Sequence, residues 1–197
     1  EVYMESAEFV RAETMFQRAT KQGARSLLVS SKDKLRRLLG DGSTFCFSSE
    51  QAPKWVSQAV GDPPSIYSLE VNGWIIDAAR YVLSKEHYDL VYLTTTDYAM
   101  HAYGPEQPES ARHLMLLDQA IEKLMETLPD VEILLTADHG MSFKSRMIHL
   151  PEVLGQHGIS AQAVPIIKDL YTVHHSNLGG CIYVYLDNVD LDEALAV

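Results

Sequence analysis

Two short segments of the sequence combine a carboxylate with an imidazole at a spacing that suits metal binding. Asp97 and His101 are four residues apart, so both side chains lie on one face if the chain turns helically there. Asp138 and His139 are adjacent, and Gly140 after them permits a break in the backbone that lets both side chains converge. Carboxylate oxygen and imidazole nitrogen form a mixed ligand set that suits zinc, manganese and iron.

Each pair also has a simpler structural interpretation. Asp97 can cap a short helix and leave His101 solvated, and residues 138–140 can form a polar turn. Taken singly, each pair fits the simpler interpretation better. Their joint occurrence favours metal binding, because both pairs follow an apolar run at the same relative position. Neither pair supplies the three or four protein ligands that a cation needs, so other donors are expected from elsewhere.

Short apolar runs precede both pairs and are predicted to be buried strands. They are rich in Leu, Val and Ile, and they comprise residues 26–29, 90–93 and 131–135. Residues 182–186 alternate along the chain and predict a fourth strand, at an edge. In an open α/β sheet ligands bind at the carboxyl ends of the strands, which is where the two candidate pairs would lie.

Segments with helical periodicity alternate with these strands. They comprise residues 12–19, 32–39, 71–85 and 114–128, the last with apolar side chains at steps of three and four residues. The alternation predicts an α/β fold, a mostly parallel sheet with helices on both faces, as one core region over residues 1–197. Loops or cap insertions are expected at residues 40–68, which are rich in Gly, Pro and Ser, and at residues 140–170, which are poorly periodic.

Composition excludes several classes of partner. The 197 residues carry a net charge of −11, so binding to nucleic acid is not expected. No apolar run approaches the roughly 18–20 residues that cross a bilayer, so no membrane is expected as a partner. Cys46 and Cys181 are the two cysteines, too few for a disulfide framework, and a reduced, cytoplasmic setting is expected.

The two candidate metal segments resemble the metal motifs of a known superfamily. Residues 96–101 and 136–141 are similar to those of the alkaline phosphatase superfamily, in particular its nucleotide pyrophosphatase/phosphodiesterase-like branch. Within that branch the chain most resembles the phosphonoacetate hydrolases. The supporting segments are spread over nearly the whole chain and comprise residues 9–12, 31–36, 46–50 and 173–175.

The resemblance implies an alkaline-phosphatase-like fold with a two-zinc (Zn2+) centre. Asp97 and His101 would bind one zinc ion, and Asp138 and His139 the other. Family members complete these shells with an N-terminal aspartate, a threonine nucleophile and a C-terminal histidine. No counterpart of these three is found, so the chain resembles an interior piece of a longer enzyme, with the nucleophile and these ligands outside it.

Three threonines and a pair of histidines are further polar candidates in the sequence. Residues 94–96 are threonines but stand at the wrong motif for the nucleophile, so no catalytic role is assigned to them. His174 and His175 could replace the missing ligand, although paired histidines in a loop are more often structural.

Lys32 and Lys34 are the candidate substrate-binding residues. On periodicity alone they are solvated residues at the start of a helix, although lysine there opposes the helix dipole. In the family that the chain resembles, this pair contacts the substrate carboxylate and supplies the positive charge that an acidic protein needs to hold a dianion. Arg36 and Arg37 are expected on the exposed face.

The expected activity is therefore metal-dependent cleavage of the carbon–phosphorus bond of phosphonoacetate to acetate and phosphate. The partner would be a small-molecule phosphonate, and a homodimer is left open. Two alternatives remain: a phosphodiesterase or nucleotide pyrophosphatase of the same superfamily, and a catalytically incomplete, non-enzymatic fragment. The lysine pair favours the first activity, because a nucleotide enzyme would need an aromatic slot for the base. The missing ligands favour the non-enzymatic fragment.

Overall fold

The computed structural model describes residues 6–140, 146, 148–165, 182–187 and 191–196. Contacts divide the chain into two compact units, Glu1–Gly140 and Met141–Val197, here named the core unit and the C-terminal unit. The expectation of one enzyme core over residues 1–197 stays a prediction. His174, His175 and Cys181 lie outside the described residues.

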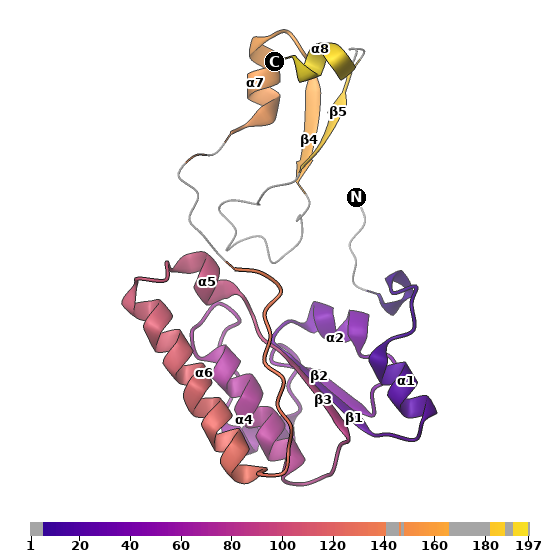
Figure 1. Ribbon diagram of the computed structural model, residues 1–197, viewed down its shortest axis with the longest axis vertical. Helices are drawn as coiled ribbons and strands as arrows, with labels where there is room; N and C mark the ends of the chain where they lie inside the picture. Colours follow the sequence, from indigo (N-terminus) through magenta and orange to yellow (C-terminus); the bar gives the residue numbers. More distant parts are fainter. Residues whose placement is uncertain (1–5, 141–145, 147, 166–181, 188–190, 197) are drawn as a thin grey trace. The chain divides into compact units, whose positions relative to one another are not determined.

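The core unit is built on a parallel sheet (Figure 1). In the described residues, β1 (Ser26–Ser30), β2 (Phe45–Ser48) and β3 (Leu90–Thr94) pair in parallel in the order β2-β1-β3. The middle strand, β1, is buried along its whole length, as its apolar run predicts. A central parallel strand must be covered on both sides, and helices cover both faces here, which confirms the predicted fold class.

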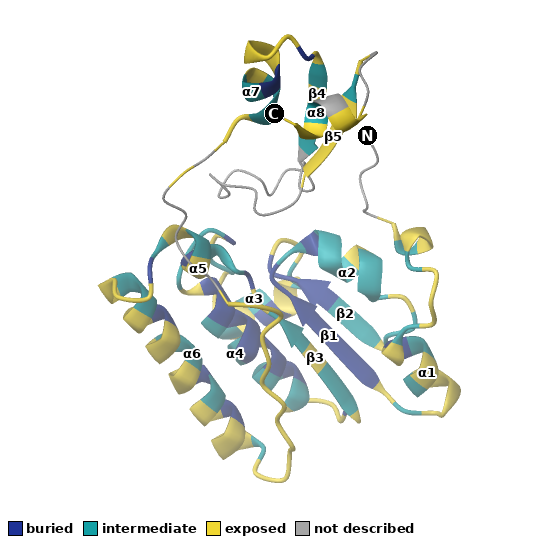
Figure 2. Ribbon diagram, turned by 45° about the horizontal axis from the view of Figure 1, so that its top comes forward, coloured by how far each residue is buried: buried dark blue, intermediate teal, exposed yellow. Residues whose placement is uncertain are grey.

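One face of the sheet is covered by α3 (Lys54–Val60) and α4 (Val71–Leu83). Alternate residues of a strand share a face, so Leu27 and Val29 both point to this side. They pack in one cluster with Ile75 of α4, and all three side chains are fully buried. Full burial of such a side chain contributes roughly 1.5–3 kcal/mol. Figure 2 shows the buried residues concentrated in β1 and along one side of α4.

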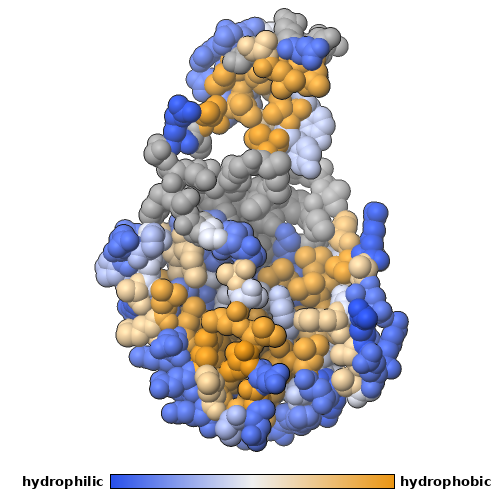
Figure 3. All heavy atoms as spheres, viewed as in Figure 1, coloured by the Kyte–Doolittle hydropathy of each residue, from blue (hydrophilic) through white to orange (hydrophobic). Residues whose placement is uncertain are grey.

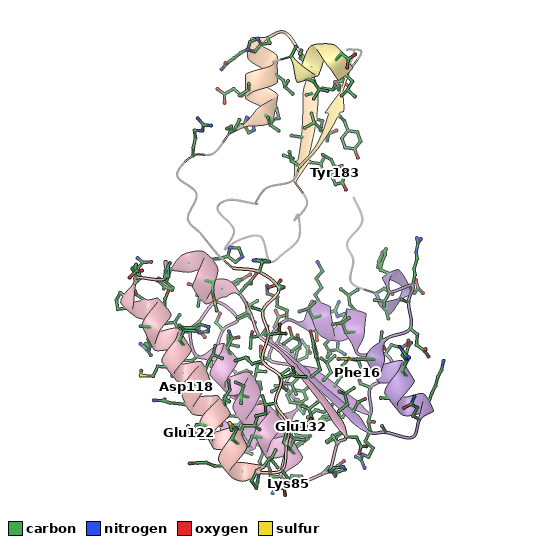
Figure 4. The ribbon with its side chains drawn as sticks, in the orientation of Figure 1. Phe16, Lys85, Asp118, Glu122, Glu132 and Tyr183 are labelled. Atoms are coloured by element: carbon green, nitrogen blue, oxygen red, sulfur yellow. The ribbon has the colours of Figure 1, made fainter. Side chains whose placement is uncertain are left out.

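The long helix α6 (Pro108–Thr127) packs on the outer side of α4. Leu117, Ile121 and Leu124 make this contact, as the apolar periodicity predicts. Leu114, by contrast, is 60% exposed. The buried position in that turn is His113 instead, because positions 113, 117, 120 and 124 form the stripe that faces α4. The charged face of the helix points away from the sheet, as the labelled side chains of Asp118 and Glu122 show (Figure 4).

The opposite face of the sheet is covered by α1 (Met15–Lys21) and α2 (Asp33–Leu39), after a short 3₁₀ helix, η1 (Ala7–Phe9). Phe16 of α1 is buried and its ring lies edge to face on that of Tyr92, with the centroids 6.2 Å apart. These two helices were predicted from their periodicity, and the structure confirms both.

Residues 40–68 are not simply loops, so that expectation is wrong in part. They contain β2, a strand of the parallel sheet, and α3, which packs on that sheet, and both contribute side chains to the hydrophobic core. β2 is only four residues long and lies among Gly, Ser and Thr residues, so the alternation of Phe45 and Phe47 was obscured in the sequence.

Residues 131–135 do not form the predicted strand. They have no regular secondary structure, and Leu134 and Leu135 are 98% and 79% exposed. An apolar run becomes a strand only where a sheet edge supplies backbone hydrogen bonds. Within the described residues, β3 pairs with β1 alone. Figure 3 shows apolar residues exposed on the side of the core unit that is turned toward the viewer.

The C-terminal unit contains an antiparallel pair of strands, β4 (Ala161–Pro165) and β5 (Ile182–Leu186). The strand predicted at residues 182–186 is therefore confirmed, and in the described residues its partner is β4 and not the parallel sheet. The unit also holds α7 (Leu150–Gln156) and α8 (Leu191–Leu195). A cap formed by residues 140–170 stays a prediction. Within the described parts, no helix combines the length and apolar character needed to span a membrane.

Candidate metal centre

The carboxyl ends of the three described parallel strands meet at one edge of the sheet, and that edge is polar. β1 leads into Ser31 and Lys32, β2 leads into Ser49, and β3 leads into residues 95–97. The fully or almost fully buried polar side chains there are Ser30, Ser31, Ser48, Ser49 and Thr96. Because ligands of open α/β sheets bind at this edge, it is the first place to look for a functional site.

Asp97 and His101 meet at this edge through a helical turn. Asp97 directly precedes α5 (Tyr98–Ala102), and the backbone N–H of His101 donates to its carbonyl oxygen at 3.1 Å. In the side chains, Nε2 of His101 lies 3.2 Å from Oδ2 of Asp97. A tetrahedral zinc ion with bonds of about 2.0–2.1 Å separates neighbouring donors by roughly 3.3 Å. The separation of the two atoms is close to this value, and the contact between the two side chains is the one that their spacing predicts.

Lys32 reaches the same carboxylate from the end of β1. Its Nζ lies 3.1 Å from Oδ1 of Asp97, and its side chain is only 15% exposed. The residue is the N-cap of α2, so the helix start directs the side chain across the sheet edge. The structure thus brings a predicted substrate-binding lysine together with a predicted metal ligand.

Asp97 is held in its ionised form. Burial raises the pKa of its carboxyl, but the charge and hydrogen bond of Lys32, with a smaller contribution from His101, outweigh burial and lower the pKa to about 2. The carboxylate is therefore deprotonated at neutral pH, which is the form that binds cations.

Asp33 anchors the helical turn that follows Lys32. One carboxylate oxygen, Oδ1, accepts hydrogen bonds from Ser48 Oγ at 2.9 Å and from Arg36 Nε at 2.5 Å. The other, Oδ2, accepts one from Arg37 Nε at 2.7 Å. The hydrogen bond from Arg36 lowers the pKa of this carboxyl against the opposing effect of burial, and Ser48 and Arg37 lower it further, to about 2.

This anchor corrects the expectation for Arg36, which is half-buried, whereas Arg37 lies on the exposed face as expected. Arg36 is 29% exposed and Arg37 is 51% exposed, and both side chains turn back to Asp33. A buried carboxylate needs compensating donors, and the arginines one turn later on the same helix are the nearest ones. With Asp33 and Ser48, the two arginines form a network that fixes α2 on β2.

Asp138 and His139 approach each other on an exposed segment. Nε2 of His139 lies 3.6 Å from Oδ2 of Asp138, and the two side chains are 62% and 89% exposed. The backbone N–H of His139 donates to Oδ1 of Asp138 at 3.0 Å, and Nδ1 of His139 lies 2.9 Å from the carbonyl oxygen of Gly140. The expected break in regular structure is present, and the two donors converge more loosely than Asp97 and His101.

The structure forms each pair but does not gather the four donors in one cluster. Among the residues it describes, no group of three or more His, Cys, Asp or Glu side chains could hold a metal ion. The donors fit zinc in chemical type and in the spacing within each pair, but they do not fit it in number. The second pair was expected at the sheet edge because residues 131–135 were predicted to be a strand, and that strand is not formed. The assignment of these ligands stays a prediction.

Sequence reasoning missed Asn72, which is buried beside the Asp97 loop. Its carboxamide makes two hydrogen bonds with the backbone of Thr96. The available signal was one polar residue on the apolar side of the predicted helix at 71–85, next to Ile75 and Ile76.

The sequence model of the type I phosphodiesterase/nucleotide pyrophosphatase family matches residues 5–195. The chain belongs to this family. The match spans almost the whole chain, including both candidate metal pairs and the lysine pair, and it confirms the resemblance drawn from the motifs.

Two solved structures of phosphonoacetate hydrolase from Sinorhizobium meliloti 1021 are also similar. The complex with phosphonoformate is 33% identical with a TM-score of 0.82, and the match covers 99% of this chain and 53% of that one. The complex with phosphonoacetate is 34% identical with a TM-score of 0.83, and the match covers 100% of this chain and 53% of that one. The chain therefore spans about half the length of the structures it matches.

Proposed function

We propose that this chain is part of a metal-dependent hydrolase that cleaves the carbon–phosphorus bond of phosphonoacetate, giving acetate and phosphate. One observation carries the proposal: the whole chain matches the phosphonoacetate complex of a phosphonoacetate hydrolase at 34% identity. The ion pair between Lys32 and Asp97 supports it, because it joins a proposed substrate residue to a proposed metal ligand at the carboxyl edge of the sheet.

In this proposal Asp97 and His101 hold one zinc ion, and Asp138 and His139 hold the other. Bound zinc would supply electrophilic stabilisation of the charge on the phosphonate oxygens. The low pKa of Asp97 keeps its carboxylate ready to bind a cation without competition from protons at neutral pH. Further donors and the nucleophile are not assigned within this chain.

Lys32 and Lys34 bind the carboxylate of the substrate in this proposal. Lys32 holds its ammonium group beside Asp97, so a substrate whose phosphonate lies at the metal pair would direct its carboxylate toward this charge. Charge-assisted hydrogen bonds to a carboxylate are stronger than neutral ones and fix its direction. The lysines would therefore orient the leaving carbon relative to phosphorus. Asp33, between them in the sequence, keeps their helical turn in place.

The direct test is product release by the native protein that carries this chain. Loaded with zinc and supplied with phosphonoacetate, the protein is expected to release acetate and phosphate in equal amounts. Asp97→Ala is expected to lose this activity. Turnover of an aryl phosphodiester without turnover of phosphonoacetate would move the assignment to phosphodiesterase. Turnover of neither substrate would favour a non-catalytic role.

A phosphodiesterase or nucleotide pyrophosphatase is the second candidate, and a group of aromatic residues favours it. The ring of Tyr98, next to Asp97, makes edge-to-face contacts with those of Tyr67 and Tyr103, with centroids 5.8 and 6.4 Å away. Aromatic rings beside a phosphate site can stack on a nucleobase. Tyr67→Ala would lower the turnover of a nucleotide substrate more than that of phosphonoacetate if this candidate is correct.

A further inference from the structure

The side chain of Asn72, the second residue of α4, is bonded to both polar groups of the Thr96 backbone. Its Nδ2 donates to the Thr96 carbonyl oxygen at 2.8 Å, and its Oδ1 accepts the Thr96 N–H at 2.8 Å. The two residues are 1% and 2% exposed. Water does not reach either group, so the folded chain has to satisfy them internally.

These bonds begin where the hydrogen-bond ladder of the sheet ends. The N–H of Ser31 donates to the Thr94 carbonyl oxygen at 3.0 Å, and the pairing of β1 with β3 stops there. Two residues later, the peptide groups of Thr96 have no strand beside them in the described part of the chain. A carboxamide carries one acceptor and one donor group, like a peptide unit. Asn72 therefore takes the place of a neighbouring strand for one residue.

This contact holds the backbone that presents Asp97. The Thr96 carbonyl belongs to the same peptide plane as the nitrogen of Asp97, so fixing one fixes the other. On the other side, the N–H groups of Met100 and His101 each donate to the Asp97 carbonyl oxygen at 3.1 Å. The Asp97 backbone is thus held from both directions. Its carboxylate can then meet Lys32 at 3.1 Å and His101 at 3.2 Å.

Packing alone does not account for asparagine at this position. Ile75, Ile76 and Ala79, which follow one and two turns later on the same side of α4, are apolar and buried. Asparagine is a weaker helix former than leucine or alanine, and a buried amide is costly unless its hydrogen bonds are made. An apolar side chain would fill the space, but it would leave the Thr96 N–H and carbonyl unsatisfied.

We propose that Asn72 is a positioning residue for the Asp97–His101 pair. By holding the Thr96 backbone, it determines where Asp97 presents its carboxylate and so how tightly the pair binds a divalent cation. The inference rests on the proposed function in one respect, that the ligand of the pair is a metal ion, and it does not depend on which substrate is cleaved. Asn72 itself contacts neither the metal ion nor the substrate in this proposal.

Two variants and one matched control test this role in the native protein. Asn72→Ala removes both hydrogen bonds. Asn72→Leu keeps a side chain of similar size but removes both the donor and the acceptor. Ser26→Ala is the control, because Ser26 is fully buried and accepts the Thr44 N–H through its Oγ at 3.3 Å. It lies at the opposite, amino end of β1, so it removes a comparable buried contact far from Asp97.

Zinc affinity, measured by calorimetry, gives the first readout. Loss of a residue that orients a metal ligand is expected to raise the dissociation constant about ten-fold or more in both Asn72 variants. Ser26→Ala is expected to lower the melting temperature and leave zinc affinity unchanged. If Asn72→Ala does not fold, Asn72→Leu, which leaves no cavity, decides the result. Zinc affinity equal to that of Ser26→Ala in the Asn72 variants would overturn the proposal, and so would the absence of zinc binding by the wild type.

Amide hydrogen exchange gives a second readout that needs no metal. The N–H groups of Met100 and His101 are expected to exchange about ten-fold faster in the Asn72 variants than in Ser26→Ala, since both donate to Asp97. Equal exchange in all variants would also overturn the proposal. If the native protein binds zinc but does not cleave phosphonoacetate, the proposed function fails, and the comparison of zinc affinities still decides the role of Asn72.

Discussion

Nζ of Lys32 lies 3.1 Å from Oδ1 of Asp97, although 65 positions separate the two residues in the chain. The pair joins the turn after β1 to the turn after β3, and Lys32 is the more buried partner, at 15% against 44% exposure. The lysine lowers the pKa of Asp97 against the effect of burial. A change at one residue therefore alters the electrostatics of the other, which makes the pair a good place to test the proposed function.

Replacing Lys32 by alanine should weaken binding of a substrate that has a carboxylate more than binding of one that has none. Lys32→Ala is expected to raise the KM for phosphonoacetate about ten-fold, which corresponds to roughly 1.4 kcal/mol of binding free energy. The KM for an aryl phosphodiester, which has no carboxylate, should rise less. Steady-state kinetics on both substrates measures the difference.

The matched control for this experiment is Lys21→Ala. Lys21 also pairs with an acidic residue, Glu13, but its side chain is 74% exposed on α1. It should leave both KM values unchanged, because exposed ion pairs contribute little. Equal increases in KM for the two substrates in Lys32→Ala would show that Lys32 does not bind the substrate carboxylate.

Asp138→Ala should abolish turnover without unfolding the protein. Its side chain is 89% exposed, and its described hydrogen bond is local, to the N–H of the adjacent His139. Substitution of such a residue changes stability by less than about 0.5 kcal/mol. Thermal unfolding and an activity assay on the same preparation test both parts. Asp130→Ala, at an exposed position eight residues earlier, is the control and should remain active. Normal turnover by Asp138→Ala would refute its assignment as a metal ligand.

The network around Asp33 should make the protein sensitive to acid. Its pKa is lowered from 3.8 to about 2 in the folded chain, so the stabilisation is complete above about pH 4 and is lost as the pH falls toward 2. The Asp33 side chain is only 8% exposed, so solvent screens its ion pairs little. The lowered pKa therefore contributes about 2 kcal/mol to the free energy of unfolding. Urea unfolding at pH 6, 4 and 2.5 measures the loss.

Asp33→Asn isolates this contribution. The variant should be less stable than the wild type at pH 6. The difference should shrink at pH 2.5, because below a pH of about 4 the Asp33 carboxyl takes up a proton when the wild type unfolds. Asp130→Asn, on the exposed segment, should keep the acid sensitivity of the wild type. A constant difference between Asp33→Asn and the wild type at all three pH values would show that the ion pairs of Asp33 are not responsible.

Local patterns in the sequence predict much of the fold. The apolar run at 26–29 and the helical stripe at 114–128 predict burial directly, and both elements are present, although Leu114 of the stripe is exposed. The run at 131–135 has the same local pattern but does not form a strand. A strand also needs a paired edge, which is a property of the tertiary structure that a local pattern does not contain.

In the candidate site, too, local contacts can be predicted from the sequence and tertiary contacts cannot. The spacing of Asp97 and His101 predicts their contact, because both belong to one helical turn. The contact of Asp97 with Lys32 depends on β1 and β3 being neighbours, and the spacing of the residues does not report it. Asn72 was missed for the same reason, since its partner lies on a different element, 24 positions away.

The zinc content of the native protein tests the central claim most directly. Two zinc ions are expected per molecule of the wild-type native protein, about one in Asp97→Ala, about one in Asp138→Ala and close to none in the double variant, measured by elemental analysis after dialysis. Lys21→Ala should retain both ions. A double variant that holds as much zinc as the wild type would contradict the assignment of both pairs and the hydrolase mechanism that depends on them.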